Sequence, residues 1–173
     1  MKYNHFINDY KRGNKMTEKL KLTGFLLFVN DVAVSKQFYQ KLFDQEIELD
    51  IHGINIGFKS GLALWQKNYA QKMIFGENFD SNSSQNTEIY FETANVESMW
   101  EKIQQTEAEI IHPLTVQPWQ QRVFRIYDPD NFIIEVAETM PDVIKRLSND
   151  GMSIETIVEK TFMPKEIVEG IIK

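Results

Sequence analysis

The feature that most constrains the fold is an order of predicted elements that occurs twice along the chain. Residues 20–66 and residues 87–138 each show the pattern of a strand, a helix and three further strands. Apolar side chains at helical spacing predict helices over 32–43 and 96–106, and each follows an Asn or Asp that can cap it. A repeated βαβββ unit predicts an α+β fold built from two similar modules.

The expected strands are short, apolar and bounded by turn residues. In the first module they cover 20–29, 47–51, 55–59 and 62–66, and in the second they cover 87–93, 109–112, 122–127 and 132–138. The second module is the longer of the two between its helix and its last strand. The additional residues fall in 112–121, which we expect to be a loop that carries Trp119.

Three further segments flank or join the modules. Residues 1–19 lack periodicity and are expected to form a flexible arm, with Met1 and Met16 both open as the start of the chain. Residues 67–86 are mostly polar and are expected to link the modules, with a short helix inside them. Residues 139–173 are expected to form a helical C-terminal tail, with helices over 140–150, 153–161 and 164–173.

Composition excludes several classes of protein. The chain has 173 residues, no cysteine and a formal net charge of −6. The lack of cysteine excludes a disulfide framework, a thiolate zinc site and a cysteine nucleophile. No run approaches the roughly 18 apolar residues of a membrane span, and the N-terminus lacks the apolar core of a signal peptide. We therefore expect a cytoplasmic protein without a membrane partner, and the acidic balance argues against nucleic acid as a partner.

The duplicated unit resembles a known superfamily. VNDVAVSKQFY in the first module and RVFRIYDPDNFIIEVAE in the second are similar to the vicinal oxygen chelate superfamily, which includes glyoxalase I, bleomycin-resistance proteins and extradiol dioxygenases. The resemblance covers about residues 20–138, and its most specific part is the DPDN-x-IIE stretch. It implies that the two modules form a pair of half-barrels of the glyoxalase/bleomycin-resistance type.

The resemblance also implies where a metal would bind. In metal-dependent relatives, four side chains from the first and last strand of each module hold one divalent ion. These positions correspond to Gly24, Ala63, Glu88 and Glu135, of which only the two glutamates carry a donor side chain. We therefore expect no cofactor, with a weakly bound divalent metal as the alternative. Glu88 and Glu135 are also the candidate catalytic residues, since one of two close carboxylates can act as a general base.

The same glutamates have a second interpretation, as polar side chains of a ligand pocket that are bridged by water, Arg122 or Arg125. Strand alternation places aromatic side chains on the faces that carry the four family positions, as a small-ligand pocket requires. The candidate ligand-binding residues are Phe28, Trp65, Tyr90, Trp119 and Arg122. The alternative is that these aromatics belong to the core.

The tail has two interpretations. Its pattern after Gly151 resembles a helix-turn-helix unit, which would suit a regulator. Its charges do not favour DNA binding, because acidic residues outnumber basic ones by one over 139–173. The tail also carries too many apolar residues for a free appendage, so we expect it to dock against the barrel or a partner subunit.

Three functions follow from these observations, and the sequence leaves open whether the protein is an enzyme. The preferred one is binding of a small organic molecule in the barrel cavity without a complete metal site. The alternative is a divalent-metal-dependent lyase, isomerase or dioxygenase of the glyoxalase type. A second alternative is a ligand-sensing regulator that uses the tail. We also expect a homodimer with pockets near the module interfaces.

Overall fold

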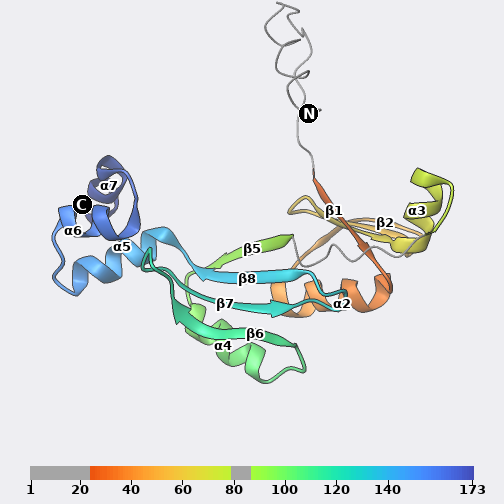
Figure 1. Cartoon of the computed structure of the whole chain (residues 1–173), viewed down its shortest axis with the longest axis horizontal. Coiled ribbons are helices and arrows are strands. Elements are labelled where there is room, and N and C mark those ends of the chain that lie inside the picture. Colours follow the sequence, from red (N-terminus) through yellow and green to blue (C-terminus); the bar gives the residue numbers. More distant parts are fainter. Residues whose placement is uncertain (1–23, 79–86) are drawn as a thin grey trace, which may run out of the picture.

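A computed structural model describes residues 24–78 and 87–173 and contains two modules followed by a helical tail (Figure 1). The first module comprises β1 (Phe25–Val29), α2 (Val32–Phe43), β2 (Ile47–Ile51), β3 (Asn55–Phe58) and β4 (Leu62–Gln66). The second comprises β5 (Glu88–Thr93), α4 (Val96–Gln104), β6 (Ile110–Val116), β7 (Arg122–Tyr127) and β8 (Ile133–Glu138). Helix α3 (Lys67–Phe75) follows β4, and α5 (Met140–Asn149), α6 (Ile154–Thr161) and α7 (Lys165–Ile172) form the tail. The predicted α+β fold with two βαβββ modules is confirmed.

Both sheets have the same strand order, β1-β4-β3-β2 in the first module and β5-β8-β7-β6 in the second. The first and last strands of each module pair in parallel, and the other pairs are antiparallel. Helices α2 and α4 each cover one face of the sheet in their own module. Alternate side chains along a strand therefore lie either under the helix or on the other face. We call this other face the open face of each sheet. A candidate site residue on a strand can reach a ligand only from this face or from an edge of the sheet.

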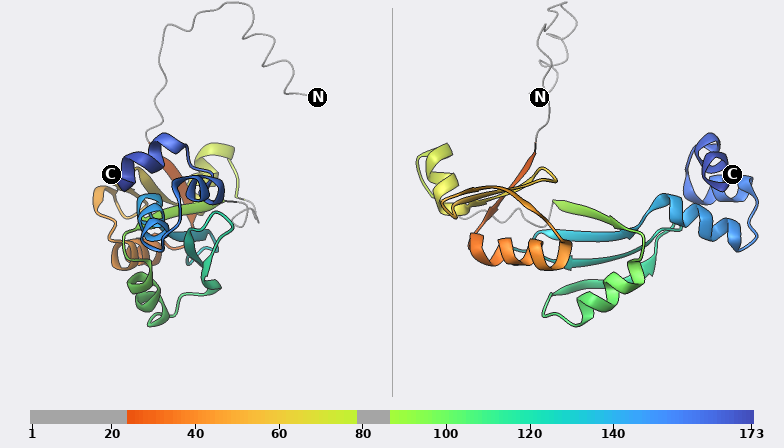
Figure 2. Two further views of the ribbon diagram at one scale, coloured as in Figure 1. Left: turned by 90° about the vertical axis from the view of Figure 1, so that its left-hand side faces the viewer. Right: turned by 180° about the vertical axis from the view of Figure 1, so that it is seen from behind.

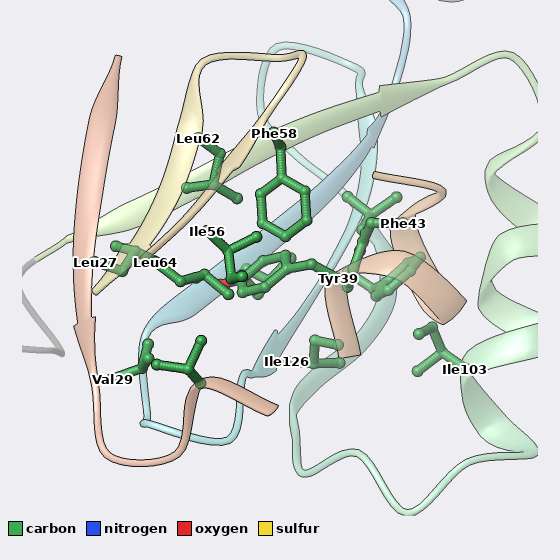
Figure 3. Close-up of a cluster of buried hydrophobic side chains, with 14 of the residues drawn as sticks. Leu27, Val29, Tyr39, Phe43, Ile56, Phe58, Leu62, Leu64, Ile103 and Ile126 are labelled. Carbon is green, nitrogen blue, oxygen red and sulfur yellow. The ribbon is translucent and has the colours of Figure 1, made fainter. Parts of the chain in front are cut away.

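One hydrophobic core joins the helix-covered faces of the two modules. Figure 3 shows Tyr39 of α2 within this cluster, close to Ile56 and Phe58 of the first sheet. Phe43, at the end of the same helix, stacks on Phe91 of β5 with 4.6 Å between ring centroids. Helix α2 therefore connects the first sheet to the second.

The turn between β7 and β8 also fastens the modules together. Asp128 accepts hydrogen bonds from the backbone N–H groups of Asp130 and Phe132, which closes the turn, and from the Tyr39 hydroxyl at 2.7 Å. Asp130 in turn accepts hydrogen bonds from Asn30 and Ser35. Burial raises the pKa of Asp128, and its hydrogen bonds only partly offset this effect. The most family-like motif of the sequence thus has a structural role.

We expect Tyr39→Phe to lower the free energy of unfolding by about 1–3 kcal/mol, because it leaves the buried Asp128 carboxylate without this donor. Urea unfolding followed by circular dichroism measures the change. Tyr69→Phe is the matched control, because Tyr69 is 47% exposed. Equal stability of the two variants would contradict a fastening role for the Tyr39 hydroxyl.

The tail forms a small core of its own. Val143, Ile144 and Leu147 of α5 pack with Ile157 of α6 and Val168 of α7, and this cluster is separate from the core of the modules. Figure 1 and Figure 2 show the three helices at one end of the molecule, opposite α3. Within the described chain, the apolar residues that we expected to dock on the barrel or on a partner subunit are buried mainly among the tail helices. Docking on a partner subunit stays a prediction.

The remaining differences from the sequence prediction are local. Strand β6 continues to Val116, so the expected loop over 112–121 is confined to residues 117–121. Asp31, Asn95 and Ser153 accept backbone hydrogen bonds at the N-termini of their helices, as Asn/Asp and Ser caps usually do. The expected arm over 1–19 lies outside the described residues. Among residues 24–78 and 87–173, no helix is long and apolar enough to cross a membrane.

Candidate functional site

A row of polar and aromatic side chains crosses the open face of the second sheet. The strand registers pair His112 with Arg125, Arg125 with Glu135, and Glu135 with Tyr90, so these residues lie side by side on four neighbouring strands. Glu88 lies on the same face, two residues before Tyr90 on β5. The expected pair, Glu88 and Glu135, is therefore diagonal across β5 and β8 rather than directly opposite.

Arg125 joins these two carboxylates. Its Nε donates to Glu88 Oε2 at 2.7 Å, and its Nη2 forms an ion pair with Glu135 Oε2. Its Nη1 lies 3.0 Å from His112 Nε2. The Glu135 side chain is only 5% exposed, and burial of a carboxylate is costly unless a cation lies beside it. The guanidinium supplies that positive charge from within the protein.

The residues do not fit the four-ligand metal site of the metal-dependent relatives. Gly24 and Ala63 offer no donor, and a Cβ built on Gly24 would lie 2.6 Å from the carbonyl oxygen of Gly61. Gly24 is thus required for the close approach of β1 to Gly61, and a side chain there has no room. No group of three or more His, Asp or Glu side chains is placed to hold a metal anywhere in residues 24–78 and 87–173.

The open face of the first sheet is apolar by contrast. Leu26 is paired with Ala63, and Phe28 is paired with Trp65. The rings of Phe28 and Trp65 meet edge to face with their centroids 6.0 Å apart. On the outer strand of this sheet, the open-face residues Leu49 and Ile51 are 54% and 46% exposed. Phe28 and Trp65 thus lie on an apolar face of the first sheet, where Trp65 also contacts Tyr69 of α3.

A pocket of about 470 Å³ lies between the edges of the two sheets. Its walls come from the beginning of β1, the turn before β4, and β5 from Glu88 to Phe91. Tyr90 is 48% exposed, and its hydroxyl donates to Glu92 at 2.8 Å. Burial and this hydrogen bond raise the pKa of Tyr90 to about 12, so the hydroxyl stays protonated at neutral pH. Of the predicted ligand-binding residues, Tyr90 lines this pocket, beside Glu88.

Trp119 and Arg122 lie away from this pocket. Trp119 donates from Nε1 to Gln121, and Gln121 donates to the Tyr90 hydroxyl at 2.8 Å, so Trp119 is connected to the pocket through one residue. Arg122 shares the helix-covered face with Phe124 and binds Glu97 and Glu138. Its position three residues before Arg125 places the two arginines on opposite faces of β7.

Sequence reasoning gave too little weight to three residues. The sequence predicts Arg125 only as one of two arginines that could bridge the glutamates, and it assigns no role to His112 or Gln121. The sequence does contain a signal for Arg125. Phe124 and Ile126, on either side of it, are apolar, so alternation along the strand places Arg125 on the opposite face from them. Gln121 connects Trp119 in the loop over 117–121 to Tyr90 on β5, and no sequence pattern indicates these contacts.

Comparisons with known proteins agree with this architecture. Residues 22–141 match the model of the glyoxalase-like domain family. The structure is similar to that of a protein of unknown function from Agrobacterium tumefaciens str. C58, with 33% identity and a TM-score of 0.66 over 73% of this chain and 100% of that one. No curated protein matches the chain.

Two solved structures of lower identity show the same fold. A glyoxalase/bleomycin resistance protein/dioxygenase from Nocardioides is 17% identical, with a TM-score of 0.59 over 77% of this chain and 92% of that one. Lactoylglutathione lyase from Agrobacterium tumefaciens is 19% identical, with a TM-score of 0.56 over 70% of this chain and 95% of that one. With its two βαβββ modules and a family match over residues 22–141, the chain belongs to the glyoxalase-like domain family of the vicinal oxygen chelate superfamily.

Proposed function

We propose that the protein binds a small organic cation with a flat apolar part, and that it does so without a metal ion. The observation that carries this proposal is the contact of Arg125 with both Glu88 and Glu135. A divalent ion held by these carboxylates would have to displace a guanidinium that already forms ion pairs with both of them. With no donor at the other two family positions, such an ion would gain few protein ligands in exchange.

The charge and shape of the open faces support the class of ligand. Glu88, Glu92 and Glu135 share the open face of the second sheet with one arginine, so negative charge is in excess there. Tyr90 adds an aromatic face beside Glu88 in the pocket. A cation beside a carboxylate and over an aromatic ring gains both a charge interaction and a cation–π interaction.

The alternative is a metal-dependent lyase, isomerase or dioxygenase of the glyoxalase type. It is supported by Glu88 and Glu135, which occupy two of the four family positions. Metal analysis of protein purified without chelator, followed by titration with Mn²⁺, Ni²⁺, Zn²⁺ and Fe²⁺, separates the two proposals. One tightly held metal per chain that is lost in Glu135→Gln would support the enzyme and contradict the metal-free site.

Proflavine, a planar aromatic cation, is a direct probe of the proposed pocket. We expect its fluorescence to report binding to the full chain, with Tyr90→Ala and Glu88→Gln each weakening affinity by roughly five- to tenfold, since each removes about 1 kcal/mol of contact. Glu159→Gln is the matched control, because Glu159 is an exposed glutamate of α6. Equal affinity in all three variants would place the dye elsewhere and count against this pocket.

We also propose that two copies of the chain form a homodimer over the open face of the first sheet. Leu26, Leu49 and Ile51 are each more than a third exposed on this face, and a contiguous apolar surface of this kind marks an association site. Light scattering should give the mass of a dimer at micromolar concentration, and Leu49→Glu should shift it to the monomer. A monomeric mass for the unmodified chain would refute the dimer.

A further inference from the structure

The loop over residues 117–121 lies between the C-terminal tail and the pocket. It connects β6 to β7, and Figure 1 shows it at the end of the second sheet from which α5 continues. Its backbone closes through hydrogen bonds between Gln117 and Gln121 and between Gln120 and Gln117. Gln120 has a positive φ of 71°, a conformation that is unfavourable for a residue other than glycine. Contacts from outside the loop must therefore stabilise it.

Arg146 of α5 supplies the contact on the side of the tail. Its Nη2 donates to the carbonyl oxygen of Gln120 at 2.7 Å and to Glu138 Oε2 at 2.9 Å, and its Nε donates to Glu138 Oε1 at 3.1 Å. Glu138 is only 2% exposed and is also held by Arg122, so it is a fixed anchor for the guanidinium. Arg146 thereby attaches the loop to the first helix of the tail.

Gln121 supplies the contact on the side of the pocket. Its Nε2 donates to the Tyr90 hydroxyl at 2.8 Å and to the carbonyl oxygen of Glu138 at 2.7 Å. Its Oε1 accepts from Trp119 Nε1 at 2.8 Å. Gln121 is 4% exposed and uses both ends of its amide, so its orientation is determined by these partners.

We propose that Arg146 is a positioning residue for the ligand pocket, through which the tail fixes the loop and the loop fixes Tyr90. The tail is then a supporting part of the binding site. The expected effect of Arg146 on ligand binding rests on the proposed function of the pocket. The link from Arg146 to the loop is independent of that proposal. Because the tail has its own apolar core, we expect the tail helices to stay folded when this polar link is lost.

The link is tested by fluorine NMR on the full chain labelled with 5-fluorotryptophan. The three tryptophans, at 65, 100 and 119, give three signals that single Trp→Phe variants assign. Arg146→Ala should shift or broaden the Trp119 signal and leave Trp100, which packs on Phe124, unchanged. Arg146→Lys should restore most of the original signal, because lysine can still donate to Gln120.

The control is Lys145→Ala, which removes an exposed cation from the neighbouring position of α5. Tyr90→Phe should shift the Trp119 signal from the other end of the link. In proflavine titrations, Arg146→Ala should raise Kd by about tenfold, because the loop loses its hydrogen bond from Arg146 to Gln120 and no longer fixes Tyr90. Lys145→Ala should not change Kd.

Each outcome decides a separate step. An unchanged Trp119 signal in Arg146→Ala or in Tyr90→Phe overturns the link itself. A changed signal with unchanged proflavine affinity overturns the role in the pocket. If the unmodified chain does not bind proflavine, the proposed ligand class fails, and the NMR result still decides whether the tail positions the loop and Tyr90.

Discussion

Replacing Arg125 with leucine is expected to lower the free energy of unfolding by about 3 kcal/mol, because it leaves the buried Glu135 carboxylate without its cation. Urea unfolding followed by circular dichroism measures this loss. The double variant Arg125→Leu/Glu135→Gln should recover most of it, because the amide carries no charge that needs compensation. A double variant as unstable as the single one would show that Arg125 acts by packing rather than by charge.

The same variant tests the metal question from the opposite direction. Without the guanidinium, Glu88 and Glu135 become available to a divalent ion. We expect millimolar Mn²⁺ to raise the melting temperature of Arg125→Leu and to have no comparable effect on the unmodified chain. The control is Arg125→Leu/Glu135→Gln, which should not respond to Mn²⁺. Equal stabilisation of the unmodified chain would contradict the proposal that Arg125 stands in place of the metal.

Alternation along the strands was enough to predict which residues share a face. It grouped Glu88 with Tyr90 and Ala63 with Trp65, as the structure shows. It could not predict which residues are directly opposite, because register depends on hydrogen bonds between strands that are far apart in the sequence. The structure pairs Glu135 with Tyr90, and this places Glu88 diagonally across.

The role of Gly24 could not be predicted either. In the sequence, Gly24 is only a family metal position without a donor side chain. In the structure it permits a backbone contact, since Phe25 donates to the carbonyl oxygen of Gly61 at 2.9 Å. A small residue in a sequence is compatible with a cavity or with close packing, and only the position of the neighbouring strand distinguishes them.

The tail shows the same limit. Its helix boundaries follow from local signals such as the Ser153 cap and the proline before α7. Its apolar residues predict that the helices bury one face. They do not predict what that face packs against, because one apolar helix face can pack on the barrel, on a partner subunit or on another tail helix. The structure buries them mainly within the tail and makes Arg146 a bridge to the modules, a contact that no periodicity reveals.

Glu138→Gln is expected to lower the free energy of unfolding by about 2–3 kcal/mol, because it weakens charge-assisted hydrogen bonds from two arginines. Burial raises the pKa of Glu138, but hydrogen bonds from Arg146 and Arg122 outweigh this effect and hold the pKa below its usual value. A lowered folded-state pKa contributes stability above the unfolded-state value, and this contribution is lost as the pH falls through the folded-state value.

The free energy of unfolding at acid pH therefore shows whether the negative charge of Glu138 contributes to stability or only its burial does. Between about pH 5 and pH 3, the unmodified chain should lose stability more steeply than Glu138→Gln, since glutamine has no proton to take up. Glu159→Gln, an exposed change on α6, should keep the steep slope. Parallel slopes for the unmodified chain and Glu138→Gln would mean that the arginines do not depend on the charge of Glu138. If the slopes differ as expected, Glu138→Gln should also loosen Arg146 and reproduce part of the Trp119 change seen in Arg146→Ala.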